Sequence, residues 1–262
     1  MESLLNINPI LLAFLATLFT YLMNLLGSLT VVFFNNISKR VLNSFLAFGA
    51  GIMIASSFFS LLNPAISLSE ELNKTSWIIV SIGFLLGGLL IIFADLVLNK
   101  ILKAKNKVNN KKRSILTFGA ITLHNIPEGM AVGIAFAGLI NNQDTQILIA
   151  AIMLSFGIGI QNFPEGVATA LPLRHEGVSK GKAFFYGQAS GAVEPLFGVI
   201  GCIFALYVNS FQPFLLSFAS GAMIATCVSE LIPQASNDNK NFSTLLFTLG
   251  FIIMMILDVA LG

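Results

Sequence analysis

Charged residues are scarce in this sequence: only 10% of its 262 residues are Asp, Glu, Lys or Arg, whereas 56% are hydrophobic. The mean hydropathy of +0.87 reflects that shortage. A soluble domain carries charge on roughly a quarter of its residues, so the composition excludes that class and is typical of a polytopic membrane protein. The net charge of +2 gives no sign of a nucleic acid partner, and we expect none.

Cysteine is nearly absent as well. Cys202 and Cys227 both fall within apolar runs, which excludes a disulfide framework and a cysteine-based metal box. A nucleotide-binding motif is also lacking, so nucleotide hydrolysis cannot drive the protein. The start, Met1-Glu2-Ser3, has no basic stretch, and we expect the first apolar run to be a retained span rather than a signal peptide.

What the chain has instead is long apolar runs. A hydrocarbon core about 30 Å thick needs roughly 20 apolar residues per helix, and the chain offers eight such runs. We therefore predict an all-α polytopic membrane protein with eight transmembrane helices in a single domain over residues 1–262. The predicted spans are 9–34, 42–66, 76–99, 115–140, 146–173, 182–209, 211–235 and 242–261.

Lysine and arginine predict the orientation, because cytoplasmic loops carry an excess of both. With eight spans and the N-terminus outside, every one of the 14 basic residues except Lys74 lies on the inner side. The loop 100–113 is the most basic, and we predict that it is cytoplasmic and close to anionic headgroups. A missed helix would reverse every later loop. The imbalance therefore favours a multi-pass protein of the cell membrane with both termini outside.

An internal repeat relates the second span to the seventh. Six positions are identical in an ungapped match of twelve residues: Leu46/Leu216, Phe48/Phe218, Gly51/Gly221, Met53/Met223, Ile54/Ile224 and Ala55/Ala225. These two spans cross the membrane in opposite directions, so the repeat is inverted, as in many secondary transporters. We predict a 3+2+3 arrangement with inverted repeats, in which helices four and five are central.

Spans three and eight give weaker support for the repeat. Gly83-Phe84 in span three matches Gly250-Phe251 in span eight. Asp95 and Asp258 follow these dipeptides, but in different register.

Two similar hexapeptides lie in the central spans. Residues 124–129 read His-Asn-Ile-Pro-Glu-Gly, and residues 161–166 read Gln-Asn-Phe-Pro-Glu-Gly. The first and fifth residues of each lie on one helix face, and the second lies about 100° further round. Two antiparallel helices could therefore gather an imidazole, two carboxylates and three amides in one small volume. The residues concerned are His124, Asn125, Glu128, Gln161, Asn162 and Glu165, and Glu194 in span six adds a third carboxylate.

Each of these glutamates has a proline beside it. Pro127, Pro164 and Pro195 cannot donate to the carbonyl groups four residues back, so the helix kinks there or leaves those carbonyls free. Such backbone is tolerated at membrane depth only where protein, water or an ion satisfies it. Gly129 and Gly166 would permit close approach of neighbouring helices.

The three glutamates also need neutralising. A carboxylate at the bilayer centre costs on the order of 2.5 to 3.5 kcal/mol, and every basic residue lies near a loop. Either the carboxylates are partly protonated or a cation neutralises them. A divalent metal with His124 as nitrogen ligand and Glu128 and Glu165 as oxygen ligands satisfies both coordination and charge.

Two other functions fit parts of the pattern. A proton- or sodium-coupled carrier of a small organic solute would use the carboxylates for coupling, but it gives His124 and the doubled Pro-Glu-Gly no shared purpose. An intramembrane metallohydrolase is the enzyme alternative. The sequence has no His-Glu-x-x-His, and its other histidine, His175, lies in a predicted loop. We therefore expect a transporter and no enzyme activity.

Two polar residues of the outer spans have alternative interpretations. Glu230, at the inner end of span seven, is either an exit-side ligand or an interfacial carboxylate. Asn24, in the first span, either joins a polar centre or packs helices together.

With these motifs the sequence resembles the ZIP family of divalent metal transporters, and within it the GufA-like prokaryotic branch. The resemblance covers the eight spans, both hexapeptides and residues 186–195, Tyr-Gly-Gln-Ala-Ser-Gly-Ala-Val-Glu-Pro. It implies uptake of zinc, and also of iron, manganese, cadmium or cobalt, into the cytoplasm by alternating access. The metal is then the transported substrate, and no cofactor is required. The resemblance further implies an elevator-like movement of the central helices against the outer ones, and a homodimer.

The resemblance also implies two ligand sets. The first comprises His124, Glu128, Gln161 and Glu165, and the second comprises Asn125, Asn162, Glu165 and Glu194, with Glu128 as another bridge. This sequence departs from the pattern at two of these positions. Gln161 stands where many members have histidine, and Asn162 stands where binuclear members have aspartate. Lysines replace the histidines that many relatives carry between spans three and four.

Overall fold

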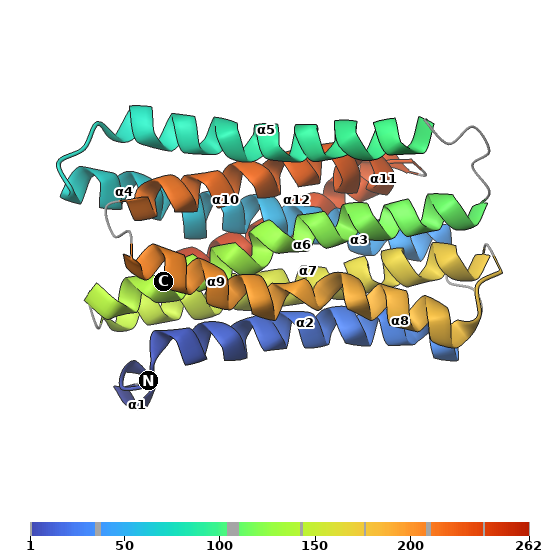
Figure 1. The fold of residues 1–262 in the computed structure, drawn as a ribbon, viewed down its shortest axis with the longest axis horizontal. Helices are drawn as coiled ribbons and strands as arrows, with labels where there is room; N and C mark the ends of the chain where they lie inside the picture. The colour runs from blue at the N-terminus through green and yellow to red at the C-terminus, as the bar shows by residue number, and fades with distance from the viewer. Residues whose placement is uncertain are drawn as a thin grey trace.

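The computed structural model is a bundle of long helices that lie roughly along one axis (Figure 1). It describes residues 2–34, 38–103, 110–141, 144–175, 177–207, 211–237 and 239–261. After the short α1 (Glu2–Leu5), the first four long segments are α2 (Pro9–Phe33), α3 (Lys39–Ser56) continued by the π-helical turn η1 (Ser57–Leu62) and α4 (Asn63–Glu71), α5 (Ser76–Lys103) and α6 (Asn110–Asn141). The last four are α7 (Thr145–His175), α8 (Lys180–Gly191) with α9 (Val193–Tyr207), α10 (Gln212–Thr226) continued by η3 (Cys227–Leu231) and α11 (Ile232–Ala235), and α12 (Lys240–Leu261).

These eight segments confirm the predicted all-α membrane architecture. Within the described residues, seven of them are long and apolar enough to cross a bilayer, and α6 adds an apolar stretch over Asn125–Ile140. The segments match the predicted spans, although the second extends past residue 66 to Glu71. Both termini lie at the same end of the bundle, as an even number of crossings requires (Figure 1). The chain is thus a multi-pass membrane protein.

Short polar side chains begin several of the spans. Asn8 precedes Pro9 of α2 and accepts a hydrogen bond from the backbone nitrogen of Ile10 at 2.9 Å. Ser38 does the same for α3, with Val41 as donor at 3.3 Å. A capping oxygen satisfies one of the amide hydrogens that the first helical turn leaves free, and proline suits the first helical position because it has none. These local signals set where the apolar runs become helix.

The long segments pack as two groups, each containing two close pairs. In the first group α2 lies along α7, and α6 lies along α9. In the second group α3 lies along α12, and α5 lies along α10, as Figure 1 shows for the last pair. The helices α6 and α7 also contact α10 and α3 of the second group, which confirms their predicted central position.

The inverted repeat is visible in this pairing. In the repeat, α2 corresponds to α9, α7 to α6, α3 to α10, and α12 to α5. The α2–α7 pair is therefore equivalent to the α9–α6 pair, and the α3–α12 pair to the α10–α5 pair. Small residues make the close approach possible. A side chain at Gly51 would collide with the carbonyl oxygen of Phe247, and one at Gly221 would collide with that of Phe84. Gly51 and Gly221 are equivalent in the predicted repeat, so both halves use the same contact.

The structure corrects the predicted register of spans three and eight. A side chain at Gly87 would meet the carbonyl oxygen of Phe218, as one at Gly250 would meet that of Phe48. Gly87 is therefore the counterpart of Gly250, and the expected match of Gly83 with Gly250 is wrong by one helical turn. The prediction failed because a Gly-Phe dipeptide recurs easily in apolar sequence. In the corrected register Asp95 and Asp258 are equivalent.

Candidate metal centre

The hexapeptide residues that were predicted to gather are buried in the middle of the first group. Asn125 and Glu128 lie on α6, Gln161, Asn162 and Glu165 on α7, and Glu194 on α9; none is more than 5% exposed. The backbone of His124 continues α6, but its side chain lies outside the described part of the structure. Six of the seven predicted ligands can therefore be placed.

The prolines and glycines of the motifs shape the helices around these side chains. Pro127 and Pro164 lie within helices that continue through them, whereas α8 ends at Gly191 and α9 begins two residues later, placing Pro195 in its first turn. Helix starts tolerate proline because no hydrogen bond is lost there. A side chain at Gly129 would collide with the backbone of Glu194, and one at Gly166 with the backbone oxygen of Asn24. The expected close approach at both glycines is confirmed.

Gln161 links the two carboxylates of the hexapeptides. Its Nε2 donates to Oε1 of Glu128 at 2.7 Å and to Oε1 of Glu165 at 3.3 Å. Two carboxyl groups are thus held beside one shared donor. This arrangement reduces the cost of burying them together.

Glu194 belongs to a second polar cluster, which includes a residue that sequence reasoning missed. Nδ2 of Asn162 donates to both carboxylate oxygens of Glu194 at 2.8 Å and to the backbone oxygen of Thr20 at 3.1 Å. The hydroxyl of Thr20, on α2, donates to Oε2 of Glu194. Beside this cluster, Nδ2 of Asn125 donates to the backbone oxygen of Ser190 at 3.0 Å.

A sequence signal for Thr20 does exist. Thr17, Thr20, Asn24 and Ser28 recur at helical spacing along the otherwise apolar α2, and all four are fully buried. Polar residues on one face of a membrane helix point into the bundle rather than at lipid. The signal shows which face of α2 is buried, but it does not name the partner of Thr20.

Five buried oxygen atoms of the hexapeptides have no hydrogen-bond partner among the described residues. They are Oδ1 of Asn125, Oε2 of Glu128, Oε1 of Gln161, Oδ1 of Asn162 and Oε2 of Glu165. Roughly nine in ten buried polar groups in proteins are paired, so five unpaired acceptors on two neighbouring helices are exceptional. Amide and carboxylate oxygens are ligands for divalent cations, and a cation would satisfy them.

The acidic groups alone do not complete such a site. In the part of the chain whose side chains are described, no group of three or more His, Cys, Asp or Glu residues could hold a metal ion. Glu128 and Glu165 share one donor, while Glu194 is bound within the second cluster. A metal site at this position would therefore need other ligands as well, and the unpaired amide oxygens are available among the described residues.

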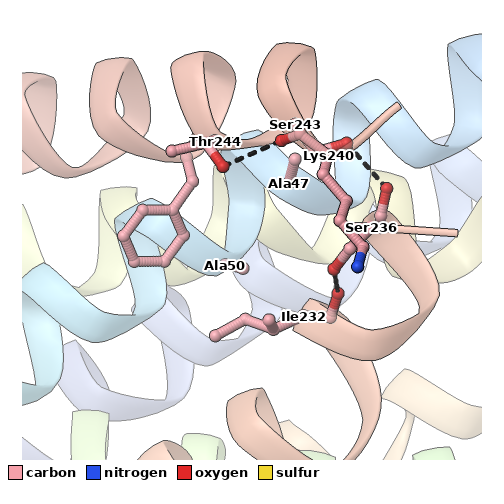
Figure 2. A pocket seen from close by; sticks show the side chains of 9 residues that line it. Ala47, Ala50, Ile232, Ser236, Lys240, Ser243 and Thr244 are labelled. Carbon is pink, nitrogen blue, oxygen red and sulfur yellow. Dashed lines mark hydrogen bonds between the residues drawn. The ribbon is translucent and has the colours of Figure 1, made fainter. Parts of the chain in front are cut away.

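A pocket of about 390 Å³ lies elsewhere, between α3, α11 and α12 (Figure 2). Its hydroxyl groups are already used: Ser243 donates to the backbone oxygen of Ala235 at 2.7 Å, and Thr244 to that of Lys240 at 2.8 Å. None of the six predicted ligands whose side chains are described lines this pocket. Its chemistry, with a lysine and satisfied hydroxyl groups, does not suit a metal cation.

Three acidic residues, Asp95, Glu230 and Asp258, lie near the ends of the outer spans, at positions that the internal repeat relates. Ser60 donates to Oδ1 of Asp258 at 2.6 Å. In the corrected repeat Glu230 is equivalent to Ser60 and Asp95 to Asp258, so a carboxylate stands where the hydroxyl donor is in the other half. Glu230 is exposed and Asp95 is half-buried, so neither joins the central clusters. The side chain of His175 lies outside the described residues.

The sequence of this chain is similar to those of known zinc transporters. The family model described as ZIP Zinc transporter matches residues 7–116 and 108–258. Zinc transporter ZIP11 of Xenopus tropicalis is 33% identical over 97% of this chain and 98% of its own length. Zinc transporter GufA of Myxococcus xanthus is 31% identical over 90% of the chain and 94% of its own length. Zinc transporter ZIPB of Bordetella bronchiseptica is 34% identical over 90% of the chain and 77% of its own length.

Proposed function

The chain belongs to the ZIP family of zinc transporters and transports divalent metal ions, and we propose that these ions reach the cytoplasm through the buried polar clusters of α6, α7 and α9. The observation that carries the proposal is the set of five unpaired oxygen atoms at membrane depth. The ligands we propose are His124, Glu128, Gln161 and Glu165 for a first metal. A second position would use Asn125, Asn162, Glu165 and Glu194.

Gln161 allows the carboxylates of the first metal position to exchange a hydrogen-bond donor for a metal ion. Its amide hydrogens hold Glu128 and Glu165 through one oxygen each. A cation arriving at these carboxylates supplies more positive charge than an amide group does, so it displaces the amide hydrogens. Gln161 is then free to offer its Oε1, which has no hydrogen-bond partner among the described residues. When the ion leaves, the same amide hydrogens return to the carboxylates and limit the cost of their burial.

Net transport requires the metal site to open alternately to the two sides of the membrane. We propose that the first group, α2, α6, α7 and α8–α9, slides against α3, α5, α10 and α12. Close packing of α2 on α7 and of α9 on α6 supports this division. The family resemblance implied an elevator-like movement of the central helices, four and five, against the outer ones. The moving unit proposed here is larger, because α2 and α9 are locked onto that pair.

The remaining features of the proposal concern the whole protein. We place it in the cell membrane with both termini outside and the basic loop 100–113 in the cytoplasm, as one transporter domain that functions as a homodimer. The distribution of lysine and arginine supports this orientation. We expect no enzyme activity and no required cofactor. A carrier of organic solutes is not favoured, since the relatives named above are zinc transporters.

Uptake of radioactive zinc into vesicles containing the purified protein tests the site. Glu165→Ala and His124→Ala should each lower the rate about tenfold or more, because each removes a ligand that cannot be replaced at membrane depth. Glu71→Ala, at the exposed end of α4, is the matched control and should transport normally. Wild-type rates in both site variants would refute the ligand assignment. Uptake of an organic solute indifferent to zinc would support the rival carrier.

A further inference from the structure

Thr20 lies on α2, outside both hexapeptides, yet it contacts two of the residues proposed to build the second metal position. Its hydroxyl donates to Glu194, and its backbone oxygen accepts a hydrogen bond from Asn162 at 3.1 Å. We propose that Thr20 is a positioning residue of the metal site: it fixes Glu194, and Glu194 fixes the amide of Asn162. This inference rests on the proposed function.

Glu194 differs from the other two buried glutamates in its hydrogen bonds. Both of its carboxylate oxygens accept hydrogen bonds, from Asn162 and from Thr20. Glu128 and Glu165, in contrast, each keep one oxygen that has no partner among the described side chains. Glu194 therefore holds its neighbours through both oxygens, and a cation in the second position would use the remaining lone pairs of those oxygens.

The consequence for Asn162 follows from the planarity of its amide group. Nδ2 is held by Glu194 and by the backbone of Thr20, so the plane of the amide is fixed. The position of Oδ1 is then fixed too, and this buried atom has no partner in the described part of the chain. A carboxylate that holds the far end of a ligand is the usual way in which proteins orient groups toward a metal. Here Glu194 plays that part, and Asn162 presents the ligand oxygen.

Packing places Thr20 opposite Glu194. A side chain at Gly191, three residues before Glu194, would collide with Asn24, and one at Gly198, four residues after it, would collide with Thr17. Two glycines thus let α2 press against α8–α9 on either side of Thr20. The Thr20 hydroxyl could also donate to the backbone oxygen of Thr17, which lies 2.9 Å away. A carboxylate is the stronger acceptor, so the bond to Glu194 prevails.

Zinc binding to the purified full-length protein, measured by titration calorimetry, tests the role of Thr20. Thr20→Val keeps the shape but removes the donor, and it should weaken zinc binding about tenfold. Thr20→Ser restores the hydroxyl and should recover affinity to within about threefold of wild type. Thr17→Val is the matched control, because among the described residues the Thr17 hydroxyl donates only to backbone oxygens of its own helix. The zinc affinity of this variant should be unchanged. A purely structural role would lower thermal stability in Thr20→Val without this pattern of affinities.

A second comparison keeps the inference testable if Thr20→Val does not fold. Glu194→Gln should weaken zinc binding about tenfold, because its new amide hydrogens face those of Asn162 and force that group to turn. Adding Thr20→Val to Glu194→Gln should cause no further loss, since Thr20 acts through Glu194. Wild-type affinity in Glu194→Gln, or additive losses in the double variant, would overturn the inference. Glu165→Ala separates the two proposals: if it binds zinc normally, the proposed site itself is wrong.

Discussion

Gln161 is the residue at which the two hexapeptides differ most in chemistry. Its counterpart is His124, which would supply nitrogen, whereas Gln161 supplies an oxygen and two amide hydrogens. Only the amide can both hold Glu128 and Glu165 and release an oxygen toward a metal. Imidazole favours zinc and copper, while oxygen ligands suit magnesium and manganese. A site with one imidazole and one amide should therefore discriminate less sharply among divalent metals than a site with two imidazoles.

We predict that Gln161→Leu lowers the stability of the protein before any metal is added. The two carboxylates would lose their shared donor, and leaving buried acceptors unpaired costs about 1–3 kcal/mol. The apparent melting temperature of the detergent-solubilised protein, measured with chelator present, checks this. Gln146→Leu, at the exposed start of the same helix, is the control and should melt like wild type. Equal melting of Gln161→Leu and wild type would show that the carboxylates do not need the amide.

At the scale of the helices, glycine determines which elements pair. Gly166 brings α7 against α2, and Gly129 brings α6 against α9, so equivalent residues of the two hexapeptides serve equivalent contacts. In a membrane the helices gain nothing by hiding from water, so close van der Waals packing between small residues contributes most of their association. The polar side chains are aligned only because these backbones approach so closely.

Replacing either glycine should therefore affect both stability and binding. Gly166→Val puts two methyl groups where the backbone of Asn24 lies, and overpacking of this kind costs about 1–3 kcal/mol or more. We expect a lower melting temperature together with weaker zinc binding. Gly181→Ala, in α8, meets open space and should change neither quantity. An unchanged melting temperature in Gly166→Val would mean that α2 and α7 are less tightly packed than the structure indicates.

Much of the site could be predicted from the sequence, since it follows from spacing within single helices. The four-residue interval in each hexapeptide correctly indicated that Glu128, Gln161 and Glu165 would meet, and the proline-flanked Glu194 indicated a third helix. Thr20 could not be assigned in this way. Its partner lies on a distant helix, and the contact depends on how α2 is rotated against α8–α9. Local periodicity describes one helix at a time.

The two π-helical turns could not be predicted from the sequence either. η1 begins at Ser57 and η3 at Cys227, which the repeat makes equivalent, but the apolar pattern gave no sign of either turn. Such turns often occur at functional sites and change the direction of the side chains that follow. Ser60 and Glu230 lie in these turns. The register error between spans three and eight had a related cause, because a two-residue match cannot fix an alignment over a whole helix.

At the scale of the whole molecule, transport requires the two groups of helices to move relative to each other. A bond between the groups should therefore stop transport, and one within a group should not. The ideal Cβ position of Gly157 on α7 lies 3.4 Å from Cγ2 of Ile52 on α3, with only the flexible end of Met254 in the way. That of Gly88 on α5 lies 3.9 Å from Cβ of Ala225 on α10, within one group.

We predict that oxidising the double variant Ile52→Cys/Gly157→Cys abolishes zinc uptake and that a reductant restores it. A sulfur near the position of Cγ2 of Ile52 would lie 3.4 Å from the Cβ atom at position 157, close to the roughly 3 Å between a Cβ atom and the far sulfur of a disulfide. Gly88→Cys/Ala225→Cys is the matched control, and its uptake should not respond to oxidation. Full uptake by the oxidised Ile52→Cys/Gly157→Cys protein, with the bond verified by mass spectrometry, would rule out sliding at this interface.

The pairing of α3 with α12 also concerns how the protein is made. Synthesis proceeds from the N-terminus, so α3 enters the bilayer long before α12 has been translated. Until then its glycine-containing face, with Gly51, meets lipid instead of the backbone of Phe247. The same delay separates α5 from α10. The first half of the chain is thus an incomplete assembly that must remain in the lipid until its partner helices arrive. The mature bundle forms only when nearly the whole chain has left the ribosome.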